Sequence, residues 1–483
     1  MYQLLQYDLL KVLYIVTIVF MVILVLQQRG DPMKTIAWLM VVTFVPLLGI
    51  VLYFFFGKNY RKEKIFSRKE LADSERINML AQYQTDNKFD TTNWPDSASF
   101  GKTHIMKMLY NSDKVLLTER NRVKILVNGK VTFDNIKKEL EKAQKHIHLE
   151  YYIIEDDHIG NEIRRILIRK AKEGLEVRLI YDDIGCWSLS KEYIQSLTDA
   201  GVRVFPFMPV RFPYLTNKVN YRNHRKIIVI DGKVGFVGGL NIADRYISGS
   251  EVLGPWRDTH LKIKGEAVYS LQSVFLLDWY FVSKRNIHDQ DQYFPPVEIT
   301  DQHLMQIVAS GPDSDWASIM QTFFSAIATA RSYIYISTPY FLPNESILTA
   351  LRTAALSGVD VRMLLPEQSQ SKLVSWSMFS FIGELLDAGI KVYLYRKGFT
   401  HSKLMMVDDA FCSIGTANMD IRSFDQNFEI NALIYDQRMT IAMRKIFMND
   451  IKDLKSININ DWDDRPRWVF FRESVARLFS PLL

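Results

Sequence analysis

One arrangement of chemically active residues occurs twice in this chain of 483 residues: a histidine, a lysine two positions later and an aspartate five positions after the lysine. The two copies consist of His224, Lys226 and Asp231, and of His401, Lys403 and Asp408. Each copy is followed by glycine and then by an asparagine, Asn241 or Asn418. Chance gives roughly a tenth of one such match in a chain of this composition, so two matching copies are a strong signal.

The residue types in the repeated motif suit the exchange of a phosphodiester. One histidine can attack phosphorus, the other can protonate the departing alkoxide, and the lysines can hold the phosphate oxygens. Asn241 and Asn418 can donate further hydrogen bonds to these oxygens. The motif therefore indicates one phosphate site that is built from two similar halves of the chain.

The aspartates of the motif have a second interpretation. Asp231-Gly232 and Asp408-Asp409 lie between apolar runs and are typical of hairpin turns. A turn role alone does not explain why a histidine precedes each aspartate at the same distance. We therefore include Asp231 and Asp408 in the candidate catalytic set, and we expect them mainly to hold the motif hairpins together.

Two apolar runs near the N-terminus, residues 12–26 and 36–56, predict a hairpin of two transmembrane helices. Each run, with its flanks, is long enough to cross a bilayer. A cleaved signal peptide is the alternative for the first run, but no small-residue cleavage site follows it. A basic cluster at residues 58–69 comes next, and such clusters stay on the cytoplasmic side. The sequence therefore predicts a multi-pass protein of the cell membrane whose catalytic part is cytoplasmic.

Composition limits the remaining possibilities. The formal net charge of +6 is a mild basic excess, which favours an anionic partner such as a lipid surface. The two cysteines do not form a metal-ligand cluster and make a disulfide framework implausible. We find no metal-ligand spacing, no phosphate-binding loop of the nucleotide-binding kind and no dinucleotide fingerprint. We therefore expect no cofactor and no metal.

The part of the chain beyond the linker contains an internal repeat. In each half the periodicity predicts helix, strand, helix, strand, helix and strand, followed by the hairpin of the histidine motif. This order predicts an α/β fold of two pseudo-symmetric lobes, with mixed or largely parallel sheets flanked by helices. We divide the chain into a transmembrane hairpin (1–57), a juxtamembrane linker with some helix (58–118), a first lobe (119–300) and a second lobe with a C-terminal tail (301–483).

The two motifs, with GGLN and GTAN after them, resemble the phospholipase D superfamily. Within it, the double apolar run, the sequence WRDTH at residues 256–260 and the C-terminal ARLFSPLL resemble bacterial cardiolipin synthases. The resemblance covers essentially the whole chain, and both motif cores are intact. It implies that Asp258 and Glu429 are the carboxylates that support the two histidines, whereas each alone would be interpreted as a surface acid at a strand edge. It also favours His224 as the nucleophile and His401 as the acid and base.

The resemblance implies a phosphatidyltransferase that joins two molecules of phosphatidylglycerol into cardiolipin and glycerol. Phosphatidylglycerol and anionic membrane lipids are then the expected partners, and nucleic acid is not. A membrane phospholipase D that uses water as acceptor is an alternative, as is a nuclease. A lipid-binding scaffold without activity is the alternative from another class, but neither half has lost its histidine or lysine. The sequence leaves the oligomeric state and the preference for the acceptor lipid open.

Three further features are interpreted more simply. His146, His148 and His260 lie in predicted strands and are expected to be structural. Residues 210–222 mix basic and aromatic side chains and can line a headgroup channel or form an ordinary surface loop. The tail, residues 468–483, carries aromatic and aliphatic side chains among arginines, so it either lies at a membrane surface or packs on the catalytic core.

Overall fold

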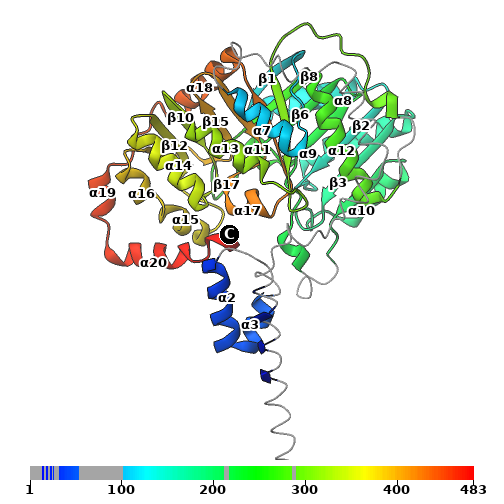
Figure 1. The fold of residues 1–483 in the computed structure, drawn as a ribbon. Helices are drawn as coiled ribbons and strands as arrows, with labels where there is room; N and C mark the ends of the chain where they lie inside the picture. Colours follow the sequence, from blue (N-terminus) through cyan, green and yellow to red (C-terminus); the bar gives the residue numbers. More distant parts are fainter. Residues whose placement is uncertain are drawn as a thin grey trace, which may run out of the picture.

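The computed structural model describes residues 32–53, 102–210, 217–285 and 290–483, together with a few isolated positions between 14 and 26. Two lobes lie side by side, each a β-sheet with helices on its outer face (Figure 1). The basic cluster at residues 58–69, residues 211–216 of the segment at 210–222, and the predicted first span apart from those isolated positions fall outside the described residues.

The first lobe is built on a mixed sheet of seven strands. Its strands are β1 (Asn121–Val127), β2 (His146–Tyr151), β3 (Glu176–Asp182), β4 (Arg203–Phe207), β5 (Ile227–Ile230), β6 (Val234–Gly238) and β8 (Thr259–Gly265). Its helices are α8 (Asn128–Glu141), α9 (His158–Lys172), α10 (Lys191–Asp199), α11 (Arg245–Ser248) and α12 (Ala267–Ser283). The strand order is β1-β8-β6-β5-β2-β3-β4.

The second lobe repeats this plan. Its strands are β9 (Met305–Ser310), β10 (Tyr333–Ser337), β12 (Asp360–Pro366), β13 (Lys391–Tyr395), β15 (Leu404–Val407), β16 (Phe411–Gly415) and β18 (Glu429–Ile434). Its helices are α13 (Ser318–Ala328), α14 (Glu345–Leu356), α15 (Lys372–Phe379), α16 (Ile382–Asp387), α17 (Ile421–Asp425), α18 (Gln437–Ile451), α19 (Ile459–Asp463) and α20 (Arg467–Arg477). The strand order β13-β12-β10-β15-β16-β18-β9 is that of the first sheet read from its other edge.

The sheets are mixed rather than largely parallel. In the first lobe β2, β3 and β4 run parallel, whereas β2–β5, β5–β6, β6–β8 and β8–β1 are antiparallel pairs. The expected alternation of strands and helices accounts for the parallel half, because parallel neighbours need helical crossovers. The antiparallel half consists of the motif hairpin, β5 and β6, together with β8 and β1. In sequence β1 precedes the parallel strands and β8 follows the hairpin.

The central strands are buried on both faces because the two sheets pack against each other. Ile228 and Ile230 of β5 belong to the core beneath the helices of the first lobe. Ile227 and Val229, which point the other way, share a core with Met406 and other residues of the second sheet. This double burial explains why β5 reads as an uninterrupted apolar run rather than an alternating one.

The N-terminal segment that was predicted as one long span contains two short helices, α2 (Pro32–Phe44) and α3 (Pro46–Leu52). Helix α2 ends just before Pro46, since a proline lacks the amide hydrogen and clashes with the preceding turn. The two helices contact each other, and Trp38 meets Tyr53 edge to face at 5.4 Å. None of the helices in the described part of the chain is both long and apolar enough to cross a bilayer.

Helix α7 (Thr103–Asp113) lies in the segment that precedes the first sheet, yet it belongs to the second lobe. It contacts α13, and its buried Ile105, Met106 and Leu109 join the core of that lobe. Its neighbour Lys102 reaches the hairpin of the second motif at Asp408, 3.5 Å away. The chain therefore passes the second lobe before it enters the first.

Candidate active site

His224 is hydrogen-bonded to a carboxylate from the other lobe. Its Nδ1 lies 3.0 and 2.9 Å from the two carboxylate oxygens of Glu429, and both side chains are buried. A carboxylate at Nδ1 holds the proton there, so Nε2 carries the free lone pair. His224 is therefore oriented as a nucleophile or a base would be.

His401 is supported in the same crossed manner. Its Nδ1 lies 2.7 Å from Oδ2 of Asp258, which belongs to the first lobe and is only 1% exposed. The sequence placed Asp258 after His224 and Glu429 after His401, but each carboxylate supports the histidine of the opposite half. The burial of Asp258 and Glu429 excludes the interpretation that they are surface acids.

Backbone pairing between the lobes produces this crossing. His224 donates its backbone N–H to the carbonyl of Phe428, the residue before Glu429, over 2.9 Å. In the same way β14 (Phe399–Thr400) pairs in parallel with β7 (Trp256–Arg257), just before His401 and Asp258. Short backbone hydrogen bonding between the lobes thus places each histidine beside the carboxylate that supports it.

Lys226 and Lys403 are buried beside the histidines. Each ammonium donates to the backbone carbonyl of its own motif histidine, Lys226 over 2.7 Å and Lys403 over 2.6 Å. Nζ of Lys403 also lies 3.1 Å from Nε2 of His401. Each ammonium keeps donors beyond this one bond, since an ammonium has three. The two lysines can therefore hold an anion between the histidines.

Burial lowers the pKa values of the lysines and histidines of the two motifs. It lowers the pKa of Lys226 to about 7 and that of Lys403 to about 8. Burial, opposed by Glu429, lowers the pKa of His224 to about 4. The pKa of His401 is lowered well below its ordinary value by burial and by the charges of Lys403 and Lys226. A bound phosphodiester would raise all four pKa values, because its negative charge favours their protonated forms.

The pKa values of the two carboxylates are shifted in opposite directions. Burial raises the pKa of Asp258 to about 6, although Lys403 acts in the opposite direction. Burial also acts to raise the pKa of Glu429, but the neighbouring His224 and Lys226 outweigh it and lower the pKa overall. Glu429 is therefore the more firmly ionised partner.

A difference between GGLN and GTAN adds to the contrast between the two carboxylates. The hydroxyl of Thr416 donates to Glu429 over 2.5 Å. The equivalent residue of the first half is Gly239, where a Cβ atom would lie 2.3 Å from Oδ1 of Asp258. The sequence shows this difference, but its role was missed because it depends on which carboxylate lies beside each position.

Asn241 and Asn418 are buried close to the motifs, with part of their hydrogen-bonding capacity already used. The amide of Asn241 accepts from the N–H of Ile153 and donates to the hydroxyl of Tyr246. The amide nitrogen of Asn418 donates to Asp420 over 3.1 Å. A primary amide has two N–H donors, so each asparagine retains one that can serve a phosphate oxygen.

Asp231 and Asp408 do not join the histidines. The carboxylate of Asp231 accepts three backbone N–H groups, from Gln144, Lys145 and His146, at 2.8 to 2.9 Å. Asp408 accepts the equivalent three, from Arg331, Ser332 and Tyr333. Both aspartates also have positive φ, 54° and 57°, in the three-residue turns that join β5 to β6 and β15 to β16, and aspartate tolerates this conformation better than most residues.

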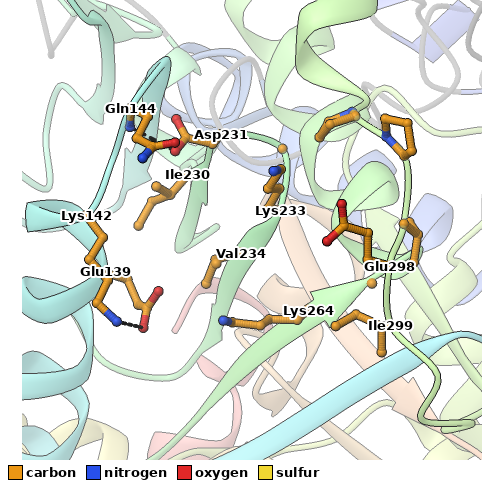
Figure 2. Close-up of a pocket in the computed structure, with 15 residues that line it drawn as sticks. Glu139, Lys142, Gln144, Ile230, Asp231, Lys233, Val234, Lys264, Glu298 and Ile299 are labelled. Atoms are coloured by element: carbon orange, nitrogen blue, oxygen red, sulfur yellow. Dashed lines mark hydrogen bonds and ion pairs between the residues drawn. The ribbon is translucent and has the colours of Figure 1, made fainter.

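A surface cavity of about 340 Å³ lies at this turn end of the first motif (Figure 2). It is lined by Asp231, Lys142, Lys233 and Lys264 among others, and neither motif histidine lines it. The cavity is therefore separate from the paired histidines.

Aromatic rings enclose the histidines and were missed in the sequence. Tyr152 meets His224 edge to face at 4.9 Å, and its ring lies 5.4 Å from the ammonium of Lys226. Tyr246 and Trp256 contact His401 at 5.4 and 5.5 Å. Tyr152 directly follows β2 at the edge of the sheet where the motif histidines lie. An aromatic residue at the carboxyl end of a parallel strand was the signal that could have found it.

The strand histidines His146 and His148 pack inside the first lobe. His148 stacks on Phe275 at 4.5 Å and, with His146, contacts Gln272. Burial lowers the pKa of His146 to about 3, of His148 to about 4 and of His260 to about 3. In the ranges that the structure describes, no three His, Cys, Asp or Glu side chains are grouped so as to hold a metal ion.

The mixed sheets, the repeated hairpins and the paired histidines define a phospholipase D-like protein. A solved phosphatidylserine synthase from Haemophilus influenzae Rd KW20 has the same fold, with a TM-score of 0.61 and 17% identity over 79% of this chain and 100% of that one. The family model described as "Cardiolipin synthase, PLD-like domain" matches residues 136–273 and 323–451. A second model, "Phospholipase_D-nuclease N-terminal", matches residues 12–58.

Similar curated proteins indicate which family of this class the chain belongs to. A cardiolipin synthase of Geobacillus sp. (strain WCH70) is 44% identical over 98% of this chain and 94% of its own length. Cardiolipin synthase 2 of Bacillus anthracis is 43% identical over 94% and 88% of the two chains. The chain belongs to the cardiolipin synthase family of the phospholipase D superfamily.

Proposed function

We propose that the protein transfers a phosphatidyl group from one phosphatidylglycerol molecule to another, which yields cardiolipin and glycerol. The observation that carries the proposal is the pair of histidines, each supported by a carboxylate of the opposite lobe and flanked by a buried lysine. This arrangement provides a nucleophile, an acid and two cations for one phosphate. The family gives the lipid substrates.

In the first half-reaction, Nε2 of His224 attacks phosphorus and forms a P–N bond. The P–O bond to the terminal glycerol breaks, and His401 gives a proton to the departing oxygen. In the second half-reaction, His401 removes a proton from a glycerol hydroxyl of the second phosphatidylglycerol. That oxygen attacks phosphorus, and the P–N bond to His224 breaks. One phosphodiester replaces another, so no nucleotide is consumed.

The phosphate itself prepares His401 to act as an acid. Burial and the charges of Lys403 and Lys226 hold the pKa of His401 well below its ordinary value. A bound phosphodiester offsets these charges, and the anion of Asp258 at Nδ1 then favours the imidazolium form. The acid is therefore charged when substrate is present.

The assignment of His224 as nucleophile can be tested by trapping the covalent intermediate. The firmly ionised Glu429 supports this assignment, since it keeps the proton of His224 on Nδ1 and the lone pair on Nε2. With a substrate that bears a good leaving group, H401A should accumulate a phosphohistidine at position 224. An adduct on His401 in H224A would reverse the assignment, and mass spectrometry of the trapped protein distinguishes the two results.

Product analysis tests the reaction class. Purified protein with labelled phosphatidylglycerol in liposomes should release glycerol and form cardiolipin without nucleotide. Phosphatidic acid as the sole product would show that water is the acceptor and that the protein is a phospholipase D. Absence of any turnover by protein that still binds anionic vesicles would favour the lipid-binding scaffold.

The proposed reaction requires access to lipids in a membrane. We place residues 1–57 in a transmembrane hairpin and both lobes in the cytoplasm, on the strength of the two apolar runs and the basic cluster at residues 58–69. The match of residues 12–58 to an N-terminal family model supports treating this segment as a unit.

A further inference from the structure

Helix α20 carries its apolar side chains outward. Trp468, Phe471, Val475 and Leu478 recur at helical spacing and are 62, 72, 40 and 77% exposed. Phe479 and Leu482, in and next to the final turn η5 (Ser480–Leu482), are 44 and 43% exposed. These six residues form the tail stripe. An exposed apolar stripe of this length on a surface helix marks an interaction site.

Three charged side chains of the same segment, Arg472, Glu473 and Arg477, are held by contacts with the protein. Glu473 is buried and forms two hydrogen bonds with Arg465, at 2.9 and 3.1 Å. Arg472 lies over the ring of Trp376 in α15, and Arg477 donates to Glu384 in α16 over 2.5 Å. Ion pairs and cation–π contacts thus hold α20 with its apolar face toward the outside, the reverse of an ordinary surface helix.

The tail stripe lies close to the catalytic region and on the side of the N-terminal helices. Helix α20 packs against α15, and η5 contacts α17, which directly follows Asn418 and Asp420. In Figure 1, α20, the C-terminus, α2 and α3 all lie at the lower side of the lobes. Helix α2 has its own exposed apolar row, in which Ile36, Met40 and Phe44 are 49, 52 and 80% exposed.

We propose that α20 and η5 lie in the surface of an anionic lipid bilayer and hold the catalytic lobes at a fixed height and tilt above it. Arg467, at the start of α20, is exposed beside Trp468 and can meet negatively charged headgroups. Trp468 stands at one end of the stripe, and tryptophan favours the interface between acyl chains and water. A contact of this kind would bring the site to the level of the lipid headgroups.

Depth-dependent quenching tests the contact without relying on activity. The two native cysteines are buried, so a single introduced cysteine in the full chain can be labelled with an environment-sensitive dye. Phe471→Cys places the dye on the stripe. Leu356→Cys is the matched control, because Leu356 is also 72% exposed but ends α14, which packs on α13 and β12. The protein is reconstituted in vesicles of phosphatidylglycerol and phosphatidylcholine that contain a nitroxide-labelled lipid.

The dye at position 471 should shift its emission to shorter wavelength and be quenched at least about three-fold more than the dye at position 356. Equal quenching at the two positions would overturn the proposal. A blue shift at position 471 that is already present in detergent, together with cross-linking between chains through that cysteine, would also overturn it. A second copy of the protein would then cover the tail stripe.

Activity provides a second readout on the same chain. The double variant F471D/L478D should lower turnover of phosphatidylglycerol in vesicles by roughly ten-fold, because two apolar anchors leave the bilayer. Its turnover of a short-chain phosphatidylglycerol that is dispersed as monomers should stay within about two-fold of the unmodified protein. L356D serves as the control. Equal losses on both substrates would show that α20 acts only through the fold, and would count against the membrane contact.

Discussion

At the scale of single residues, the hydrogen bonds of His224 and His401 show why neither half of the chain holds a complete site. Each imidazole takes its orientation from a carboxylate of the other half, Glu429 or Asp258. Each is also affected electrostatically by the lysines of both motifs. The candidate catalytic unit is therefore a set of six side chains in which each histidine–carboxylate pair spans the boundary between the lobes.

Loss of either histidine should remove nearly all activity. H224A and H401A should each lower kcat by about a thousand-fold or more, and the double variant should be little worse, because the two residues act in one reaction. Independent half-sites would instead leave about half of the activity in each single variant. Steady-state kinetics with phosphatidylglycerol in mixed micelles distinguishes these outcomes.

The site should give a bell-shaped dependence of kcat/KM on pH. On the acidic side the rate should fall as pH drops through about 6, the pKa of Asp258, because His401 then loses its anionic partner. On the alkaline side it should fall above about 7 to 8, where Lys226 and Lys403 lose their protons in the empty enzyme. In kcat the alkaline limb should move to higher pH, since bound phosphate raises the pKa of both lysines.

A pH profile measured on both parameters tests these assignments. The variant D258N should lower activity and remove the acidic limb, because an amide does not titrate. A kcat/KM that stays flat from about pH 5 to 9 would contradict the assigned groups.

Thr416 should act as a positioning residue for Glu429. T416V removes the hydroxyl that donates to this carboxylate, so the pKa of Glu429 should rise and Glu429 should hold His224 less firmly. We expect kcat to fall roughly ten-fold, and T416S, which keeps the hydroxyl, to recover most of it. A T416S protein that loses as much kcat as T416V would contradict the role assigned to the hydroxyl.

The sequence predicts the histidines and lysines well because their chemistry is carried by residue type and spacing. Asp258 and Glu429 are predicted only from the resemblance to the phospholipase D superfamily. The sequence does not predict which histidine each carboxylate supports. That pairing depends on the ladder between β7 and β14, two strands of two residues each from different lobes. Contacts of such high sequence separation leave no local periodicity to detect.

At the scale of elements, the motif hairpins fix the distance between the turn and the site. In β5 and β15 an extended strand of four residues separates the turn from the histidine region. Seven residues from His224 to Asp231 span roughly 20 Å in extended conformation, so the aspartate anchors the far end of the strand. Its three backbone hydrogen bonds join the hairpin to the start of β2.

Removal of this anchor should affect stability more than catalysis. D231A loses three hydrogen bonds and places alanine at a φ of 54°. Two of the three amides can turn to water, so we expect a loss of about 1–3 kcal/mol in the free energy of unfolding. D231N, which tolerates this φ, should lose less, and the exposed K233A should serve as a neutral control. Thermal unfolding measures the change, and kcat of the folded fraction should remain within about two-fold.

The elements themselves were predicted unevenly. The parallel strands and the motif hairpins follow from apolar runs and turn residues, and the structure confirms them. The antiparallel edge formed by β8 and β1 was not predicted, because its strands lie on either side of the rest of the lobe in sequence. The second apolar run near the N-terminus has the composition of a span, but Pro46 divides the described helix there.

At the scale of the whole molecule, face-to-face packing of two equivalent sheets creates the shared site. Residues of both central hairpins, such as Val229 and Met406, form one apolar core between the sheets. This core and the two inter-lobe ladders hold the histidines in register. A lobe expressed alone would expose this face and lack the carboxylate for its own histidine.

The orientation of the whole molecule in the membrane gives the last prediction. The basic cluster at residues 58–69 should keep both lobes in the cytoplasm and leave the connection around residue 31 on the outside. Native Cys186 and Cys412 are buried and should not react, so single introduced cysteines report their own position. An impermeant maleimide applied to intact cells should label Asp31→Cys. It should label Lys130→Cys, on an exposed position of α8, only after lysis. Labelling of position 130 in intact cells would place the catalytic lobes outside and remove the cytoplasmic assignment, whereas labelling of neither position before lysis would show that residue 31 does not reach the outer surface.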